Sequence, residues 1–514
     1  LCLGCFTGCV GSIDNSAYVP TGDALLMEGE DPAEETIAPD SQDLTLAYYP
    51  DRSMNPLYGS DYTNRVVMSL MYQGLFAVDS KNNTTPILCS QYQVTPDNRT
   101  WTIYLEPNAT FSDGTRVTVQ DVVASYEQAR QNVYYKGRFT HIARVELSSD
   151  GGVDFFLDTP YQNLALLLDI PIVKASEVTV DNPLGTGPYS LEDGIGGKHL
   201  QRVVGWWCSS DDLVAKDSSI ALVEAESPSQ IRDEFEFSGL SVVCTNPQTD
   251  SYADYRCDFE LWEVDSGFMM YIGCNVTYSK FFDDGTLRTF LTYGIDRQTL
   301  VDDNYGGLAL PTTLPISPMS PYYSKSLATN YDYDEMRFID AASKFRVPTN
   351  DKGVPRTLQL LVNSDDSARL RCARNIAATL TELGLACETV ESPTSVYEAR
   401  LQAANYDIYL GITKLPTTAD LSEFYRPWGE MSWGGLANET IYNMVNQSLA
   451  DRGNYYNLHK LVADDGRIIP VMAGYYAIYA KRGVLSDLNP ARDNVFYYTL
   501  GKTMESSKVA TQFS

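Results

Sequence analysis

Hydrophobic residues alternate with polar ones over residues 101–105, WTIYL, and this period of two is typical of a strand with one buried face. Residues 44–49 read as another strand. Apolar residues then recur at helical spacing over residues 66–71, and Gly74 stands where a glycine commonly ends a helix. The first part of the chain is therefore predicted to mix strands with helices.

The second half of the chain predicts a longer alternation of elements. Residues 358–362 form an apolar run expected of a buried strand, and residues 370–383 carry apolar side chains at helical spacing up to Gly384. Residues 386–390 read as the next strand, and a further helix face is predicted over 287–295. Strand, helix and strand in this order predict a β-α-β unit, so the fold class is α/β with mixed sheets.

Two aspartates, Asp113 and Asp121, stand close together in the stretch FSDGTRVTVQDVVASYEQA. Asp113 belongs to an Asp-Gly pair typical of a tight turn. Thr118, followed three residues later by Asp121, is the pattern of a capping box, in which the two residues bond each other's backbone amides at a helix start. Both carboxylates are therefore interpreted as structural, and not as a catalytic pair or a metal site.

Two glycine-rich stretches resemble phosphate-binding loops but lack required residues. In residues 183–189, PLGTGPY, the third glycine is missing and Pro188 removes a backbone donor. In residues 194–199, GIGGKH, no serine or threonine follows Lys198. The first stretch is interpreted as a chain crossing with close backbone contacts, and the second as a hairpin turn.

Length and charge narrow the classes of function. A chain of 514 residues is long enough for two or three domains. Its 67 acidic and 38 basic side chains give a net charge of −29, which disfavours nucleic acid as a partner. No apolar run reaches the length of about eighteen residues that a membrane-spanning helix needs, so any membrane attachment is expected to use an anchor.

The first residues, LCLGCFTGCVGS, resemble the apolar end of a signal peptide. Residues 6–9, FTGC, resemble a bacterial lipobox, so residues 1–9 are expected to be a signal-peptide remnant and Cys9 to be lipidated. Cys5 is a second candidate, and ordinary signal-peptide cysteines without a lipid are the alternative. Residues 10–40 are acidic and aperiodic, which predicts a disordered tether.

Cysteines and histidines give little sign of catalytic or metal chemistry. Seven cysteines follow Cys9, and none forms a C-x-x-C pair, so most are interpreted as small buried residues with room for one disulfide. The histidines His141, His199 and His459 lack metal-ligand spacing and are interpreted as lone core or surface residues. No G-x-S-x-G or H-E-x-x-H motif occurs.

The order of several motifs resembles the family 5 solute-binding proteins of bacterial ABC importers, which include the oligopeptide- and dipeptide-binding proteins. The resemblance extends from about residue 44 to 500. The matching stretches are Asn55-Pro56-Leu57, MYQGL (71–75), Pro86-Ile87-Leu88, FSDG (111–114), TVQDVVAS (118–125), GTGPY (185–189), LRTFLTYGIDR (287–297), YDIYL (406–410) and GGLANE (434–439).

The resemblance implies two lobes with mixed sheets, joined by a hinge, that close on a ligand. It places a smaller β-rich subdomain in residues 59–170 and the second lobe in residues 271–465. The discontinuous first lobe would consist of residues 41–58, 171–270 and 466–505. The chain would cross between the lobes near Cys274-Asn275 and again near Ile469-Pro470.

The resemblance also suggests ligand residues. In the oligopeptide-binding members an aspartate of the second lobe pairs with the peptide's α-ammonium, and Asp420 matches that position best, with a surface or helix-capping role as the alternative. Trp428 and Trp433 stand beside glycines and suit a ligand wall, the alternative being packing inside the lobe's own core. Asn275, at the first crossing, is the fourth candidate.

The predicted function is that of a lipid-anchored receptor on the extracellular face of a Gram-positive cell membrane. As a monomer, it would capture peptides and present them to the permease subunits of an ABC transporter powered by a separate ATPase. No cofactor, no metal, no nucleic acid partner and no enzymatic activity are expected. The alternatives are a binder of the same fold for a nickel chelate, a sugar or a signalling pheromone, and a secreted hydrolase built on two carboxylates or a Ser/His/Asp triad.

Overall fold

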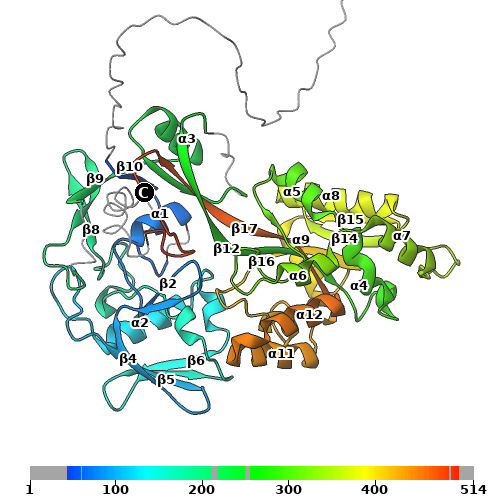
Figure 1. The fold of residues 1–514 in the computed structure, drawn as a ribbon, viewed down its shortest axis with the longest axis horizontal. Coiled ribbons are helices and arrows are strands. Elements are labelled where there is room, and N and C mark those ends of the chain that lie inside the picture. Colours follow the sequence, from blue (N-terminus) through cyan, green and yellow to red (C-terminus); the bar gives the residue numbers. More distant parts are fainter. Residues whose placement is uncertain (1–42, 59–60, 210–216, 249–254, 486–487, 497–514) are drawn as a thin grey trace, which may run out of the picture. The chain divides into compact units, whose positions relative to one another are not determined.

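An eleven-stranded mixed sheet is the central element of the computed structural model (Figure 1). The structure describes residues 43–58, 61–209, 217–248, 255–485 and 488–496. The predicted signal-peptide remnant with Cys9 and the predicted tether over 10–40 lie outside the described residues.

The central sheet joins strands from both halves of the sequence. Its order is β15 (Cys387–Ser392), β14 (Leu358–Asn363), β16 (Ile408–Lys414), β12 (Phe259–Cys274), β17 (Ile468–Lys481), β11 (Val242–Thr245), β1 (Thr45–Tyr48), β10 (Ser219–Glu224), β9 (Gly197–Arg202) and β8 (Tyr189–Gly194), with β13 (Leu310–Pro311) paired to β17. Parallel and antiparallel neighbours both occur, as expected for a mixed sheet.

The long strands β12 and β17 connect the two ends of this sheet. They pair with each other in antiparallel register, and Figure 1 shows them leading from the side of β10 and α3 (Pro228–Phe237) to the side of β14. Their register shifts between Asp265 and Met269. Gly267 lies in this break with a φ of +79°, a conformation that glycine adopts without strain. A second shift lies between Met270 and Tyr271, so both irregular points of this strand pair come before the predicted crossing at Cys274-Asn275.

Two smaller sheets lie within the predicted β-rich subdomain. One is four-stranded, in the order β4 (Cys89–Val94), β5 (Thr100–Leu105), β7 (Val153–Leu157) and β6 (Ile142–Leu147), and the other pairs β2 (Phe76–Val78) with β3 (Thr84–Pro86). The described residues group as one compact unit, so the lobe boundaries stay a prediction.

Helices flank these sheets. The remaining α-helices are α1 (Tyr62–Met68), α2 (Val119–Ala129), α4 (Thr286–Phe290), α5 (Arg297–Tyr305), α6 (Lys325–Ala328), α7 (Glu335–Lys344), α8 (Ser367–Glu382), α9 (Thr394–Gln402), α10 (Ser422–Tyr425), α11 (Glu439–Ala450) and α12 (Tyr455–Asp465). Short 3-10 turns are η1 (Lys136–Phe139), η2 (Leu164–Leu167), η3 (Ala175–Glu177), η4 (Lys280–Phe282), η5 (Leu291–Gly294), η6 (Thr329–Tyr331), η7 (Trp433–Gly435) and η8 (Arg452–Asn454).

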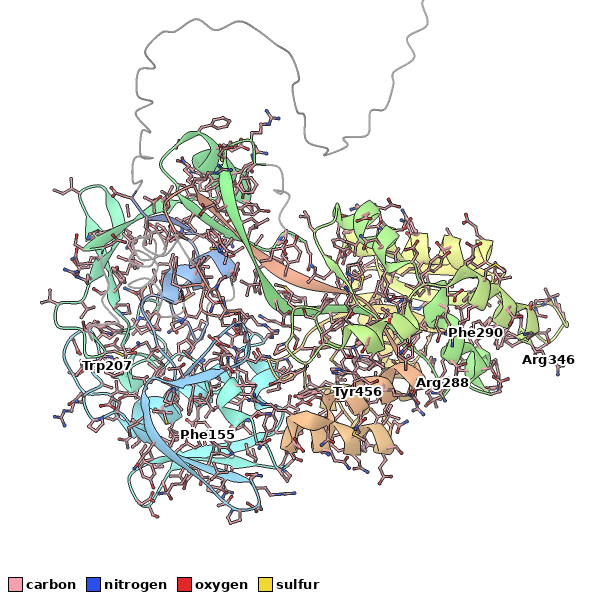
Figure 2. All side chains as sticks on the ribbon, viewed as in Figure 1. Phe155, Trp207, Arg288, Phe290, Arg346 and Tyr456 are labelled. Atoms are coloured by element: carbon pink, nitrogen blue, oxygen red, sulfur yellow. The ribbon has the colours of Figure 1, made fainter. Side chains whose placement is uncertain are left out.

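Large hydrophobic cores lie on different parts of the central sheet. Phe155 of β7 belongs to a core that joins the four-stranded sheet to α1 and β1, and Phe290 of α4 belongs to a core around β14 and α8 (Figure 2). Successive residues of β12 point into different cores, because Met269 and Tyr271 pack in the first and Met270 and Ile272 in the second. Residues 269–272 of the strand are buried on both faces, which holds the two ends of the sheet together.

The predicted β-α-β unit is confirmed. Strands β14 and β15 pair in parallel, with α8 between them in the chain. Asp366 begins α8, because its side chain accepts a hydrogen bond from the amide of Arg369. Gly384 follows the helix with a φ of +99°, as expected of a glycine that ends a helix.

The structural interpretation of the two aspartates is also confirmed. Thr118 and Asp121 form a capping box at the start of α2, with the Asp121 carboxylate accepting the Thr118 amide at 2.8 Å. The other oxygen of Asp121 accepts the amide of Ala175 at 2.7 Å. Asp113 accepts the amide of its neighbour Thr115 and pairs with Lys174 at 2.8 Å. Both carboxylates thus hold the backbone in place.

Two predicted helices differ from the structure. The helix predicted up to Gly74 ends at Met68, and the chain then turns inward, where a Cβ on Gly74 would lie 2.7 Å from the Asp169 carbonyl carbon. The helix face predicted over 287–295 is divided into α4 and η5. In both cases tertiary packing of buried apolar residues, and not helical periodicity, sets the backbone.

Gly185 lies in the predicted chain crossing, which the structure confirms. The amide of Gly187 donates to the carbonyl of Met71 at 2.8 Å, and a Cβ on Gly187 would lie 2.6 Å from the Leu70 carbonyl oxygen. A Cβ on Gly185 would overlap the Met71 carbonyl oxygen. The second glycine stretch forms the hairpin turn between β8 and β9, also as predicted.

Replacing Gly185 with alanine is expected to lower the free energy of unfolding by about 3 kcal/mol or more, because the methyl group meets backbone that cannot rotate away. The matched control is Gly196→Ala, where a Cβ would meet no atom within 4 Å. Chemical denaturation of the two variants measures the difference. Equal stability of the two would show that the backbone crossing at Gly185 is not close.

Candidate functional site

A cavity of about 530 Å³ lies against the β12 strand and helix α1. This volume falls in the range of roughly 300–1,000 Å³ that is usual for small-molecule sites. Segments far apart in the sequence line it, among them residues 68–82, 262–265, 319–321 and 488–496. The cavity therefore draws on all three predicted parts of the chain: first lobe, β-rich subdomain and second lobe.

The cavity wall combines apolar surface with ionised groups. Its larger apolar side chains are Met68, Tyr72, Phe76, Trp206, Trp262, Met319 and Phe496. The indole of Trp206 is fixed, because its nitrogen donates to the Thr186 carbonyl at 2.8 Å. An apolar wall with a few oriented polar groups is the usual arrangement of a ligand site.

A buried ion cluster centres on Asp493 at the cavity wall. Arg65 of α1 and Arg138 of η1 each contact its carboxylate at 2.6 Å, and the hydroxyl of Tyr134 donates to it. Arg138 also forms a two-bond pair with Asp169, at 2.7 and 2.9 Å. Burial alone would raise the pKa of Asp493, but Arg138 and Arg65 hold it below its ordinary value.

A second ion pair closes the same wall. Arg492 pairs with Asp265 of β12 and donates to the Leu415 carbonyl at 2.8 Å. A Cβ on Gly267 would lie 2.6 Å from that carbonyl oxygen, so glycine is needed where β12, residue 415 and Arg492 meet. Residues 488–496 are thus fixed at two neighbouring side chains, because Arg492 binds β12 of the sheet and Asp493 binds α1 and η1.

Asp420 lies outside this cavity, in a buried pair with His141. The carboxylate of Asp420 is 3.2 Å from Nε2 of His141, and it also accepts the Ser422 amide at 2.8 Å. His141 is 2% exposed, and its Nδ1 lies 2.8 Å from Asp158. His141 is therefore not the lone histidine predicted from the sequence, because a partner distant in the chain completes its hydrogen bonding.

Electrostatics favour the charged form of this pair. Burial alone would lower the pKa of His141, but the carboxylates of Asp420 and Asp158 raise it to about 9. Burial alone would raise the pKa of Asp420, but His141 holds it below its ordinary value. Near it, the hydroxyl of Tyr161 donates to Thr418 at 2.8 Å. The loop before α10 is thus fastened to the predicted β-rich subdomain by buried polar contacts.

The two candidate tryptophans differ in environment. Trp428 is 96% exposed and has a φ of +61°, in the left-handed region. Trp433 is half-buried and packs against the core that contains Phe155. Neither lines the 530 Å³ cavity. Their roles as ligand contacts stay predictions.

Asn275 is buried and fully engaged with the backbone. Its amide nitrogen donates to the carbonyls of Ala404 and Tyr406 at 2.9 and 2.8 Å, and its oxygen accepts the Tyr278 amide at 3.0 Å. A Cβ on Gly434 would lie 2.9 Å from its Cα, so Asn275 and the segment of Trp433 are neighbours. The structure brings these two candidates together, at a place apart from the cavity.

The cavity residues Arg65, Arg492 and Asp493 were not among the sequence candidates. No motif surrounds them, since the ions that pair stand up to 428 positions apart, as Arg65 and Asp493 do. The one usable signal was charge in an apolar setting: Arg65 precedes two valines on the buried face of α1. A charged residue on a core-facing stretch is a candidate for a buried pair.

The part of the chain that the structure describes gives little sign of a metal site, a membrane-spanning helix or a disulfide. Within it, no three His, Cys, Asp or Glu side chains gather as metal ligands. No helix in the described ranges combines the length and hydrophobicity needed to cross a membrane. The cysteines over 89–387 are all free, so the disulfide for which the sequence left room does not form among them.

The protein resembles known proteins in sequence. The family of bacterial extracellular solute-binding proteins, family 5 (middle region), matches residues 83–435. The glutathione-binding protein GsiB of Escherichia coli O6:K15:H31 is 25% identical over 302 residues, covering 54% of this chain and 57% of that protein. GsiB of Salmonella typhi matches to the same extent. The chain thus spans about half the length of the curated relatives it matches.

Solved structures show the fold. The periplasmic murein tripeptide-binding protein MppA in its unliganded open form has a TM-score of 0.74 at 15% identity, covering 89% of this chain and 96% of that one. A putative peptide-binding protein AppA from Clostridium difficile has a TM-score of 0.71 at 16% identity, covering 90% and 99%. The expected periplasmic-binding-protein-like fold is confirmed, and the chain belongs to the family 5 bacterial extracellular solute-binding proteins.

Proposed function

We propose that this protein is the substrate-binding subunit of an ABC importer, capturing short peptides in the cavity between β12, α1 and residues 488–496. The observation that carries the proposal is the cavity itself, which combines peptide-sized volume, apolar walls and buried ion pairs. Family membership adds support, and so do its relatives, whose names record the binding of glutathione, murein tripeptide or other peptides. The bound peptide would be delivered to membrane permease subunits.

The proposal includes an extracellular, lipid-anchored location on a Gram-positive cell. Lipidation of Cys9 would hold the chain at the membrane surface, with residues 10–40 as the tether. The predicted lobe boundaries and a monomeric state belong to the same proposal. A binding role without catalysis agrees with the family-level relatives, which are solute-binding proteins.

Asp420 remains our candidate for the peptide's ammonium, although its carboxylate is already paired with His141. Serving a ligand would require the loop before α10 to separate from His141 when the ligand enters. Trp428, Trp433 and Asn275 remain candidate ligand contacts, although none of them lines the cavity. The cavity residues Trp262 and Met319 join them, because they line the space directly.

Peptide binding is expected to stabilise the chain against heat. In a thermal unfolding screen with pools of di- to octapeptides, a peptide at 100 times its dissociation constant should add about 2.7 kcal/mol. Ser320→Trp, which fills the cavity wall, is expected to abolish the shift, whereas Ser326→Trp on the exposed face of α6 should retain it.

The same screen separates the alternatives. A shift with nickel chelates or sugars, and none with peptides, would reject the peptide proposal and keep the solute-binding family. A peptide shift that survives in Ser320→Trp would place the peptide outside this cavity. Loss of the shift on acetylating the peptide N-terminus, together with its loss in Asp420→Asn, would assign the ammonium to Asp420.

A further inference from the structure

A basic arm, residues 344–357 (KFRVPTNDKGVPRT), follows helix α7. It contains four cations and one acid, Lys344, Arg346, Lys352, Arg356 and Asp351. Four positive charges against one negative give the arm a net charge of +3, whereas the whole chain has −29. Figure 2 shows Arg346 on the loop that extends past the end of α7, away from β14 and α8. The arm thus reverses the charge of the protein locally.

Three of the arm's cations have no carboxylate partner. Lys344 pairs with Asp340 of α7 at 2.7 Å. Arg346, Lys352 and Arg356 form no ion pair within 4.0 Å among the described residues, and all three are exposed. Their charges are therefore available to a partner outside the molecule.

Hydrogen bonds hold the arm in one conformation. The amide of Arg356 donates to the Pro348 carbonyl at 2.8 Å. The amide of Asn350 donates to the Val354 carbonyl at 2.9 Å, and its side-chain oxygen accepts the amides of Lys352 and Val354 at 2.9 and 3.1 Å. Because the turn is formed before any partner binds, little conformational entropy is lost when its cations are engaged.

Apolar side chains are exposed beside these cations. Val354 in the arm is 53% exposed, and Met336 and Ile339 of α7 are 76% and 38% exposed. Met336 and Ile339 stand three residues apart and so share one face of the helix that leads into the arm. Exposed apolar groups next to Lys and Arg suit the interface of an anionic membrane, where the apolar groups enter the headgroup region.

The acidic charge of the whole chain does not prevent such contact. Exposed charges more than about 8 Å apart are largely screened at physiological salt, so the local charge of the arm decides. Each Lys or Arg near an anionic lipid surface strengthens binding about fivefold, and three together strengthen it roughly 100-fold. This gain is weak for a free protein but sufficient for one that a lipid anchor already keeps at the membrane.

We propose that the basic arm docks on the anionic phospholipid headgroups of the cell membrane. The inference rests on the proposed function in one respect, the location at the outer face of that membrane. It adds an orientation, in which the end of the predicted second lobe that bears α7 and the arm faces the lipid. None of the arm's residues lines the cavity, so this surface is separate from the proposed peptide site.

The test measures co-sedimentation of the full chain with vesicles of phosphatidylcholine, with and without an equal part of phosphatidylglycerol. Every protein carries Cys9→Ser, so that the proposed lipid anchor plays no part. The arm variant neutralises the three unpaired cations by Arg346→Gln, Lys352→Gln and Arg356→Gln. The matched control makes the same change of charge at three exposed cations of separate segments that also lack an ion pair among the described residues, by Arg116→Gln, Arg256→Gln and Lys325→Gln.

The parent and the control should bind the vesicles with phosphatidylglycerol roughly 100-fold more tightly than the arm variant does. Arg346→Lys with Arg356→Lys keeps the charge and should retain binding. Equal binding by the arm variant and the control, or binding that does not need phosphatidylglycerol, would overturn the proposal. Arm-dependent binding to soluble polyglutamate as tight as to the vesicles would assign the arm to an acidic protein, and would overturn it too.

The thermal screen with peptides keeps this inference apart from the proposed function. The arm variant should show the same peptide shift as the parent, because the arm lies outside the cavity. Arm-dependent vesicle binding without any peptide shift would reject the peptide proposal and leave the docking surface standing. A peptide shift without vesicle binding would reject the docking surface alone.

Discussion

Replacing Arg138 with glutamine is expected to lower the free energy of unfolding by about 3–5 kcal/mol. The arginine is 7% exposed and bonds to the carboxylates of Asp169 and Asp493. The shorter, neutral side chain would leave Asp169 buried without its cation and Asp493 with only Arg65. Because buried charges without partners are strongly unfavourable, this should be one of the most damaging single substitutions in the chain.

Arg144→Gln is the matched control for this prediction. Arg144 is paired with Glu146 at 3.2 Å, but the two side chains are 58% and 55% exposed. An exposed pair contributes about 0–1 kcal/mol, so the control should remain close to the parent in urea denaturation. If Arg138→Gln lost no more than the control, the ion cluster at the cavity wall would not be buried as described.

The stability of the protein is expected to decline with rising pH because of His141. Its pKa is about 9 in the folded chain and about 6.5 when unfolded, so the folded state holds the proton more tightly. The stabilisation is fully present below pH 6.5 and is lost as the pH rises through about 9. A difference of this size corresponds to about 3 kcal/mol.

Urea denaturation between pH 6 and pH 10 measures this contribution, with His141→Gln as the test variant and His199→Gln as the control on the hairpin strand β9. The gap in stability between the parent and His141→Gln should narrow as the pH rises, while His199→Gln should follow the parent. A gap that is constant with pH would mean that His141 is neutral in the folded protein and that Asp420 lacks a cationic partner.

Local patterns predicted those elements whose geometry depends on neighbours in the chain. The capping box at Thr118 and Asp121 needs only residues three apart, and the β-α-β unit around α8 follows from periodicity and Gly384. The close crossing at Gly185 was predicted because two glycines without side chains let another stretch of backbone approach closely. In each case the determining residues lie within one short window of sequence.

The ends of helices depend on contacts with residues far away in the sequence, which a short stretch of sequence does not contain. The apolar residues up to Met71 favoured a longer helix, but the backbone at Gly74 packs directly against Asp169, ninety-five positions later. The stretch over 287–295 likewise breaks at Phe290, a core residue that contacts Phe338. Packing between distant segments decides such boundaries, and periodicity alone does not report it.

The sequence predicted that a ligand cavity exists, but it did not predict which residues line it. The family resemblance indicated a ligand cavity between lobes, and the structure has a cavity of suitable size. Its ions, however, come from α1, η1, β12 and residues 488–496, and only folding brings them together. Asp420 and Asn275 looked like ligand residues because the resemblance assigns positions, whereas their hydrogen bonds in this chain go to His141 and to backbone carbonyls.

A crystal structure of the chain with a peptide from the thermal screen would test the central claim most directly. The account predicts peptide density in the cavity lined by Arg65, Trp262 and Asp493. Peptide bound elsewhere, for example against the exposed Trp428, with the cavity between β12 and α1 free of it, would contradict the account.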